Sequence, residues 1–261
     1  MNINSIIVVS DIFTNFAKQH EFVINYSELI RNLTKHPPDA ELFLVPGQGM
    51  SVELLHSLTR QFDSLHLRVL EPTRHLPRAG NRQAHKQRSH NIVVSLARRL
   101  GPNDYEMSIH FDENNEFFQD HMTGQHIQGM AIMEAMRQSF LAVTEQYHLH
   151  TSMQAYYFVI HDMSVRFERF LFPVDARLSY KVVEERIKDS RYGATVSMRV
   201  EQADEICATG SVSFTAFDAT FIEGRERVAA KEVLVKHLNH LRNYWPEQFP
   251  DSRPAFPTQS A

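Results

Sequence analysis

The 261-residue sequence is poor in cysteine and lacks both long apolar runs and a strong excess of either charge. The single cysteine, Cys207, excludes an intramolecular disulfide and a metal site built from several thiolates, and it fits a reducing compartment. A net charge of −4 gives no general attraction to nucleic acid. No stretch approaches the roughly 20 apolar residues of a membrane span, and the first residues do not have the pattern of a signal peptide. We therefore expect a cytoplasmic protein without nucleic-acid or membrane partners.

Residues 1–71 alternate short apolar runs with amphipathic segments, which is typical of a small α/β domain. Pro37 ends the first amphipathic segment, and Ser51 is a residue type that caps the start of a helix. The expected elements are strands at 5–11, 41–45 and 65–70 and helices at 22–33 and 51–62. This β-α-β-α-β order predicts a parallel layer.

Gly47-Gln48-Gly49 follows an expected strand and precedes an expected helix, which is where a phosphate-binding loop would lie. Two glycines fall short of the full G-x-G-x-x-G pattern, and no Walker lysine follows them. A nucleotide site and a plain turn are both compatible with these residues, and we favour the turn.

Residues 72–87 form a basic linker that contains lysine and arginine but no acidic residue. The segment is either a solvated connector or a surface that meets an acidic partner or a phosphate.

Residues 88–222 show a different pattern, in which apolar and polar residues alternate on either side of one long helix. Short alternating runs predict an antiparallel sheet. The helix, within residues 128–148, is apolar on most sides and must be covered on most of them. The expected strands are 91–98, 105–111, 154–160, 163–170, 176–183, 194–200 and 206–214. The domain therefore has an α+β layout in which a sheet can wrap a central helix.

Residues 223–261 are expected to contain a helix at 228–245 and, beyond Pro246, a proline-rich disordered tail. The sequence leaves open whether this helix packs on the preceding domain or on a partner.

Three polar residues interrupt the apolar central helix. Glu134, Arg137 and Gln138 have i, i+3 and i+4 spacing and so share one face. One interpretation is a structural ion pair at a subunit boundary. The other is a carboxylate in a cleft, whose pKa burial would raise and Arg137 would lower. Both interpretations remain open at this point.

Two histidines, His121 and His126, precede the helix. His126 lies close enough to the helix start to form a general acid/base pair with Glu134. The two histidines also have the spacing of metal ligands, but no second ligand pair supports zinc. We expect neither a metal nor a cofactor.

The stretch from 85 to 138 resembles the A-factor biosynthesis (AfsA-type) hotdog domains. The resemblance extends over roughly residues 85–220. More distantly, FFQDH (117–121) and EAMRQ (134–138) are similar to the 3-hydroxyacyl-carrier-protein dehydratases. The residues that carry the main resemblance are His85-Lys86, Phe117-Phe118, Asp120-His121, His126, Gly129-Met130, Glu134-Ala135 and Arg137-Gln138.

The resemblance implies a hotdog fold, in which a curved antiparallel sheet wraps a long helix, here preceded by the small α/β unit. It implies an enzyme of signal-molecule or secondary-metabolite synthesis that acts on thioesters of acyl carrier protein or CoA. The reaction it suggests is transfer of a β-ketoacyl group to a glycerol-type phosphate. The implied catalytic residues are Glu134, His126 and His121, and the implied substrate-binding residues are Arg137, Gln138, Gly129, Met130, His85 and Lys86.

Two rival functions remain. Dehydration of a 3-hydroxyacyl thioester would make His121 essential, and a non-catalytic acyl-binding or scaffold protein would not need Glu134. The chain also departs from the family pattern. Gln128 stands where a proline usually precedes Gly-Met, and only one motif is present where the family usually carries two repeats. A homodimer would restore the paired arrangement.

Overall fold

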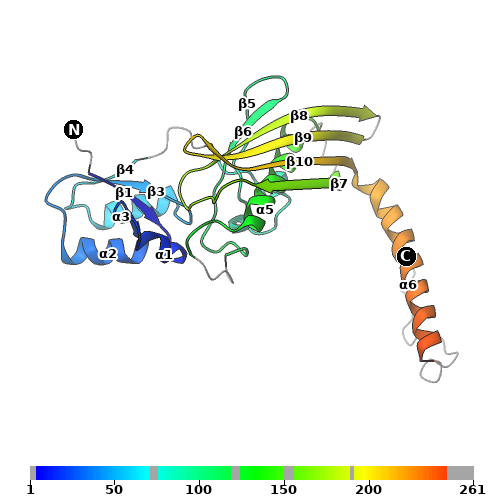
Figure 1. The fold of residues 1–261 in the computed structure, drawn as a ribbon, viewed down its shortest axis with the longest axis horizontal. Coiled ribbons are helices and arrows are strands. Elements are labelled where there is room, and N and C mark those ends of the chain that lie inside the picture. The colour runs from blue at the N-terminus through cyan, green and yellow to red at the C-terminus, as the bar shows by residue number, and fades with distance from the viewer. Residues whose placement is uncertain (1–3, 71–75, 119–123, 150–155, 189–190, 246–261) are drawn as a thin grey trace.

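The computed structural model describes residues 4–70, 76–118, 124–149, 156–188 and 191–245. Two sheets organise these residues, one with four strands and one with six. Figure 1 shows the α/β unit at one end of the larger sheet and a long C-terminal helix leaving from the other end. The mixed α+β fold is as predicted from the sequence.

The N-terminal unit is the predicted parallel layer, with strand order β2-β1-β3-β4. One boundary prediction was wrong, because residues 23–25 are a strand rather than part of the helix expected at 22–33. Asn25 accepts a hydrogen bond from the Glu28 amide and so starts the helix at Tyr26. The elements are β1 (Ser5–Val9), α1 (Thr14–Ala17), β2 (Val23–Asn25), α2 (Tyr26–Lys35), β3 (Leu42–Pro46), α3 (Val52–Gln61) and β4 (Leu67–Val69).

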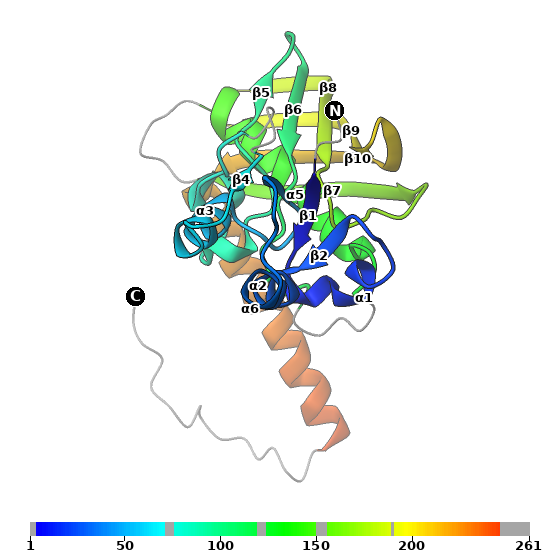
Figure 2. The same cartoon turned by 90° about the vertical axis from the view of Figure 1, so that its left-hand side faces the viewer.

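The second unit is a six-stranded antiparallel sheet curved around the helix α5 (Gly129–Tyr147), which is the hotdog arrangement (Figures 1 and 2). The strand order β5-β6-β8-β9-β10-β7 places β7 at an edge. The short helix α4 (Asn81–Ala84) lies against α5. The strands are β5 (Arg98–Arg99), β6 (Asp104–Ser108), β7 (Tyr156–Phe167), β8 (Arg177–Lys188), β9 (Arg191–Gln202) and β10 (Glu205–Asp218).

Residues 91–98 do not form the continuous strand expected from their alternation. Val94 and Ser95 make isolated bridges, and regular pairing begins only at Arg98. The reason is that side chains of α5 take the hydrogen bonds that a neighbouring strand would supply. Gln138 accepts from the Val93 amide at 2.9 Å, and Gln146 accepts from the Ala97 amide at 3.0 Å.

The α/β unit contributes side chains to the core of the hotdog unit and also has a second buried cluster of its own. Phe13 and Phe16 belong to the same buried cluster as Phe111 and Phe118, and the rings of Phe13 and Phe118 lie 5.7 Å apart. A domain boundary near residue 71 stays a prediction.

The turn Gly47-Gln48-Gly49 joins the two units instead of presenting its amides to a ligand. The amides of Gly47, Gln48 and Gly49 donate to the carbonyls of Val8, Pro173 and Phe111, respectively. A Cβ at Gly47 would lie 2.8 Å from the Pro173 oxygen, which explains the need for glycine. Since all three amides are taken, the geometry favours the plain turn over a phosphate-binding loop.

The C-terminal helix α6 (Ala219–Tyr244) begins nine residues earlier than expected, because Asp218 caps it by accepting from the Thr220 amide. Ile222 is the one residue of α6 that is buried. No helix in the described part of the chain is both long and apolar enough to cross a membrane. The predicted disordered tail after Pro246 lies outside the described residues.

Candidate functional site on the polar face of the central helix

Helix α5 is apolar on most sides but carries a polar face made by Glu134, Gln138 and Glu145. These positions differ by four and eleven residues, so they lie within roughly 40° of one another on the helix. All three side chains are directed at the segment 81–93, which includes α4. The polar residues of this buried helix therefore dock the basic segment that precedes the sheet.

The Glu134 carboxylate is the centre of this contact. One oxygen, Oε1, accepts from Lys86 Nζ at 2.8 Å, from an Arg137 terminal nitrogen at 2.9 Å and from Gln138 Nε2 at 2.9 Å. The other oxygen, Oε2, accepts from Arg137 Nε at 2.7 Å. Glu134 is only 8% exposed, and four donors compensate its burial.

Gln138 is fully buried and connects Glu134 to the backbone of the docked segment. Its amide nitrogen donates to the Asn91 carbonyl at 2.8 Å as well as to Glu134. Its oxygen accepts from the Val93 amide. The position of the carboxylate is thus tied to the backbone of residues 91–93.

His85 and Glu145 make the second contact between the segment and α5. His85 Nε2 lies 3.2 Å from Glu145 Oε1, and Arg82 approaches the same carboxylate at 3.8 Å. His85 ends α4 with a φ of 50°, a left-handed conformation that points the following Lys86 back toward α5.

The charges of Lys86, Arg137 and Glu134, which we call the 86–134–137 cluster, sum to one positive charge. Burial tends to raise the pKa of Glu134, but hydrogen bonds from Arg137, Lys86 and Gln138 outweigh it, so the pKa lies below its ordinary value. Glu134 is therefore ionised at neutral pH. The Lys86 and Arg137 side chains remain 25% and 30% exposed, so both cations still reach solvent.

A family model described as the A-factor biosynthesis hotdog domain matches residues 71–218, which is more than half of the chain. The chain belongs to the AfsA hotdog-domain family. The match covers the basic linker, the whole six-stranded sheet and helix α5, and it confirms the resemblance seen in residues 85–138. No match was found among the curated proteins.

Solved structures with partial likeness to this AfsA-family chain include a hot-dog-like protein, a thioesterase and a dehydratase. A hot-dog-like protein from Thermanaerovibrio acidaminovorans is 17% identical, with 49% of this chain and 92% of that chain covered and a TM-score of 0.38. A mutant thioesterase from Pseudomonas aeruginosa is 12% identical, with coverage of 66% and 96% and a TM-score of 0.36. A dehydratase heterocomplex from Xenorhabdus doucetiae is 9% identical, with coverage of 54% and 91% and a TM-score of 0.41. At these scores the likenesses carry no argument about chemistry.

Three further predicted site residues, His126, Gly129 and Met130, lie around the start of α5 in this AfsA-family chain. The His126 ring packs 4.8 Å from the Phe170 ring, whereas the bonds of the Glu134 carboxylate go to Lys86, Arg137 and Gln138. A Cβ on Gly129 would come within 3.0 Å of the Phe167 ring, and Met130 is 56% exposed. His121 lies outside the described residues.

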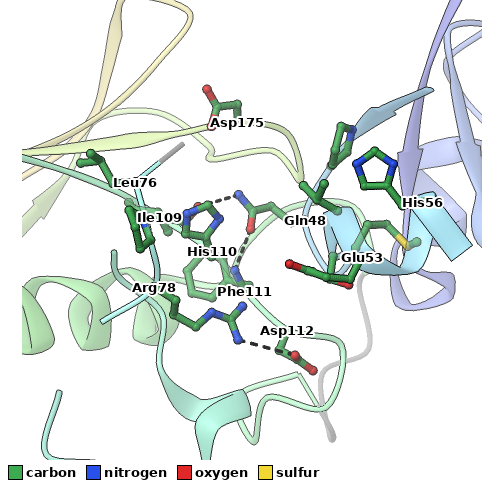
Figure 3. A pocket seen from close by; sticks show the side chains of 16 residues that line it. Gln48, Glu53, His56, Leu76, Arg78, Ile109, His110, Phe111, Asp112 and Asp175 are labelled. Atoms are coloured by element: carbon green, nitrogen blue, oxygen red, sulfur yellow. Dashed lines mark hydrogen bonds and ion pairs between the residues drawn. The ribbon is translucent and has the colours of Figure 1, made fainter. Parts of the chain in front are cut away.

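A separate hollow of about 650 Å³ lies between the α/β unit and the hotdog unit. Figure 3 shows the side-chain amide of Gln48 at the wall of this hollow, where it is bonded to the backbone of Ile109 and Phe111. Arg78 faces Asp112 there at 3.7 Å. No residue of the 86–134–137 cluster lines it. This hollow is therefore distinct from the site on α5.

Sequence reasoning selected Lys86 and Glu134 separately but missed that they form one ion pair. It also missed Glu145, whose side chain is only 8% exposed. A signal for Glu145 was present, because eleven residues after Glu134 is three helical turns along the same face.

The depressed pKa of Glu134 predicts a specific dependence of stability on pH. A carboxyl group with a folded pKa below its unfolded value of about 4.5 stabilises the fold above that value, and the effect is lost as pH falls through the folded pKa. Urea unfolding should therefore show a difference in free energy between the wild type and Glu134→Gln that is constant between about pH 5 and pH 7. The difference should shrink as the pH drops below the pKa of the unfolded carboxyl group. A difference that stays the same under strongly acidic conditions would contradict an ionised, donor-held Glu134.

Proposed function

We propose that this chain is an acyl-thioester enzyme of signal-molecule or secondary-metabolite synthesis that transfers a β-ketoacyl group to a glycerol-type phosphate. The donor is a thioester of acyl carrier protein or CoA. The observation that carries the proposal is the net positive 86–134–137 cluster on the central helix of an AfsA-family hotdog domain.

The cluster suits an anionic substrate group. Lys86 and Arg137 are held by Glu134 in a partly buried position, where a charge is screened less than on an open surface. Arg137 already bonds the carboxylate through Nε and one terminal nitrogen, and its remaining donors can bind phosphate oxygens. A phosphate on the acceptor would thus be oriented beside α5 without the cost of moving the cations into place.

The transfer forms a C–O bond and breaks a C–S bond. The acceptor hydroxyl attacks the thioester carbonyl carbon, its proton passes to a base, and the departing thiolate takes up a proton. We assign the proton transfers to His126, since imidazole is the side chain most often used for this purpose. Glu134, being ionised, holds the two cations and is unsuited to donate a proton.

We further propose that the working unit is a homodimer paired across the outer edge of β7. This strand is 12 residues long and lies at the edge of the sheet, with Tyr157, Ile160 and Phe167 at least 40% exposed. Long edge strands of this kind readily pair with another chain. In a two-fold dimer the same surface of each copy contacts the other copy. The second copy would then supply the second hotdog domain that family members usually carry in one chain.

A non-catalytic acyl-binding or scaffold function is the second candidate. One observation favours it, namely that Glu134, Gln138 and Glu145 on α5 all have partners in the docked segment 81–93. Under this function Glu134 would stabilise the fold only, and its replacement would leave biological activity unchanged.

The proposal is tested by intact-mass spectrometry of acyl carrier proteins incubated with the chain. We expect a β-ketoacyl carrier protein to lose its acyl group only when dihydroxyacetone phosphate is present. Loss of water from a 3-hydroxyacyl carrier protein would instead establish dehydration and contradict acyl transfer. Unchanged masses with every substrate would favour the scaffold function.

A further inference from the structure

Glu145 is a buried carboxylate that lies outside the 86–134–137 cluster. Its side chain is only 8% exposed, and its neighbours are His85 Nε2 at 3.2 Å and Arg82 Nε at 3.8 Å. Burial of a carboxylate is unfavourable unless neighbouring groups compensate the loss of water. An exposed position would avoid this cost, so the buried place of Glu145 beside His85 indicates a role for the contact.

His85 is held in a backbone conformation that few residues other than glycine adopt. Its φ of 50° and ψ of 48° are left-handed. The ring is fixed on two sides, by Glu145 of α5 and by the ring of Phe158 of β7, whose centroid lies 5.1 Å away at an angle of 88°. Ala84, immediately before it, is fully buried. The helix and the sheet therefore both stabilise the turn at His85.

Asn81 fixes the backbone of Lys86 within the same turn. Its side-chain nitrogen donates to the carbonyls of Lys86 and Gln87 at 2.9 and 2.8 Å. Its own carbonyl accepts from the Lys86 amide at 3.0 Å. One residue thus binds both backbone polar groups of Lys86, which sets the direction in which the lysine side chain leaves the turn.

The turn directs two consecutive side chains to widely separated points on α5. Glu134 and Glu145 are eleven residues apart, so their α-carbons lie about 16 Å apart along the helix axis. The α-carbons of His85 and Lys86 are only about 3.8 Å apart. His85 therefore reaches toward the end of α5 to meet Glu145. Lys86 reaches toward its start, where Nζ lies 2.8 Å from Glu134.

The two cations of the cluster differ in how they are held there. Arg137 lies on α5 itself, three residues from Glu134, and bonds it through two nitrogens. Lys86 comes from a segment 48 residues away in the sequence, so its place in the cluster depends on how that segment docks on α5. A contact that fixes the segment should therefore affect Lys86 and leave Arg137 in place.

We propose that Glu145 is a positioning residue for binding of the acceptor phosphate, and that it acts through His85 on Lys86. The inference rests on the proposed function, which gives this phosphate to the cluster. Lysine has a flexible stem with a large rotamer entropy. A contact that fixes its direction beforehand reduces the entropy that is lost when an anion binds. Glu145 itself touches neither the phosphate nor the reacting atoms in this account.

Isothermal titration with dihydroxyacetone phosphate tests the inference in a double-variant cycle of Glu145→Leu and Lys86→Met. Glu145→Leu should weaken binding about fivefold, because Lys86 is then no longer held in place. It should have no further effect in the Lys86→Met protein, since it acts through that lysine. Glu145→Gln should bind within about twofold of the wild type, because its amide can still bond His85.

Glu106→Leu is the matched control for Glu145→Leu. The Glu106 side chain is also largely buried, with 15% exposed, and it pairs with Arg98. This pair joins β6 to β5 and is not part of the contact between segment 81–93 and α5. The control should bind the phosphate ester within about twofold of the wild type. His85→Ala removes the Glu145 contact from the more exposed partner, and it replaces Glu145→Leu in the cycle if that variant does not fold.

Two results of the titration would overturn the positioning role. Unchanged binding by Glu145→Leu would mean that the contact does not influence the site. Weakening that persists in full in the Lys86→Met protein would mean a general structural effect.

A wild type that does not bind the phosphate ester would instead contradict the proposed phosphate site, and urea unfolding would then decide the positioning role alone. Lys86→Met should change the unfolding equilibrium constant by a factor at least about threefold smaller in the Glu145→Leu background than in the wild type. Equal factors in the two backgrounds would show that Glu145 does not hold Lys86 and would overturn the inference.

Discussion

Replacing Glu134 with glutamine is expected to lower kcat/KM by about a hundredfold to ten-thousandfold while the chain still folds. The amide keeps the shape of the side chain but loses the charge that holds Lys86 and Arg137. The free energy of unfolding should fall by only about 1–3 kcal/mol, because both cations reach solvent and can be hydrated. Steady-state kinetics with a β-ketoacyl carrier protein and dihydroxyacetone phosphate, together with urea unfolding, measure the two effects.

The matched control for this variant is Glu116→Gln. Glu116 also pairs with an arginine, Arg88, at 2.9 Å, but both side chains are more than 60% exposed. Its replacement should leave kcat and KM within about twofold of the wild type, as expected for an exposed ion pair. If Glu134→Gln also left both constants unchanged, the cluster would have no part in the reaction. If it unfolded the chain, the ion pair would be structural.

Replacing Gln138 with leucine is expected to lower the free energy of unfolding by about 4 kcal/mol. Leucine fills similar space but leaves the Val93 amide and the Asn91 carbonyl without their partner, and it removes one donor from Glu134. Each unsatisfied buried polar group costs about 1–3 kcal/mol, so the three losses together exceed the effect of most single substitutions. Urea unfolding monitored by circular dichroism measures the change.

Gln146→Leu serves as the control for that experiment, since Gln146 makes the same kind of bonds to the backbone of Ala97 from an exposed position on α5. Water can replace those bonds, so a loss below about 1 kcal/mol is expected. Equal losses for the two glutamines would show that burial of Gln138 does not determine its contribution.

Periodicity predicted the main elements of the fold because most of them bury one face. The alternation in residues 176–183 and 194–200 identified β8 and β9, and the apolar pattern of residues 128–148 identified α5. Residues 91–98 alternate equally well but are not a continuous strand, because the side chains of Gln138 and Gln146 take the amides of Val93 and Ala97. Hydrogen bonds that side chains of a distant segment supply leave no trace in the local pattern of apolar and polar residues.

The site was predicted only in part for a similar reason. The spacing of Glu134, Arg137 and Gln138 showed that they share a face, and the structure joins them by hydrogen bonds. The pairing of Lys86 with Glu134 spans 48 residues of sequence and depends on the left-handed turn at His85. Neither a contact across so long a separation nor the backbone angle of His85 could be inferred from residue types alone.

The central claim is that the 86–134–137 cluster binds the phosphate of an acceptor, and isothermal titration with dihydroxyacetone phosphate tests it most directly. Lys86→Met removes one cation while keeping a long apolar side chain. The account predicts that the wild type binds the phosphate ester and that this variant binds it at least about tenfold more weakly, the equivalent of one 1.4 kcal/mol interaction. Equal affinity in the two proteins, or no binding by the wild type, would contradict it.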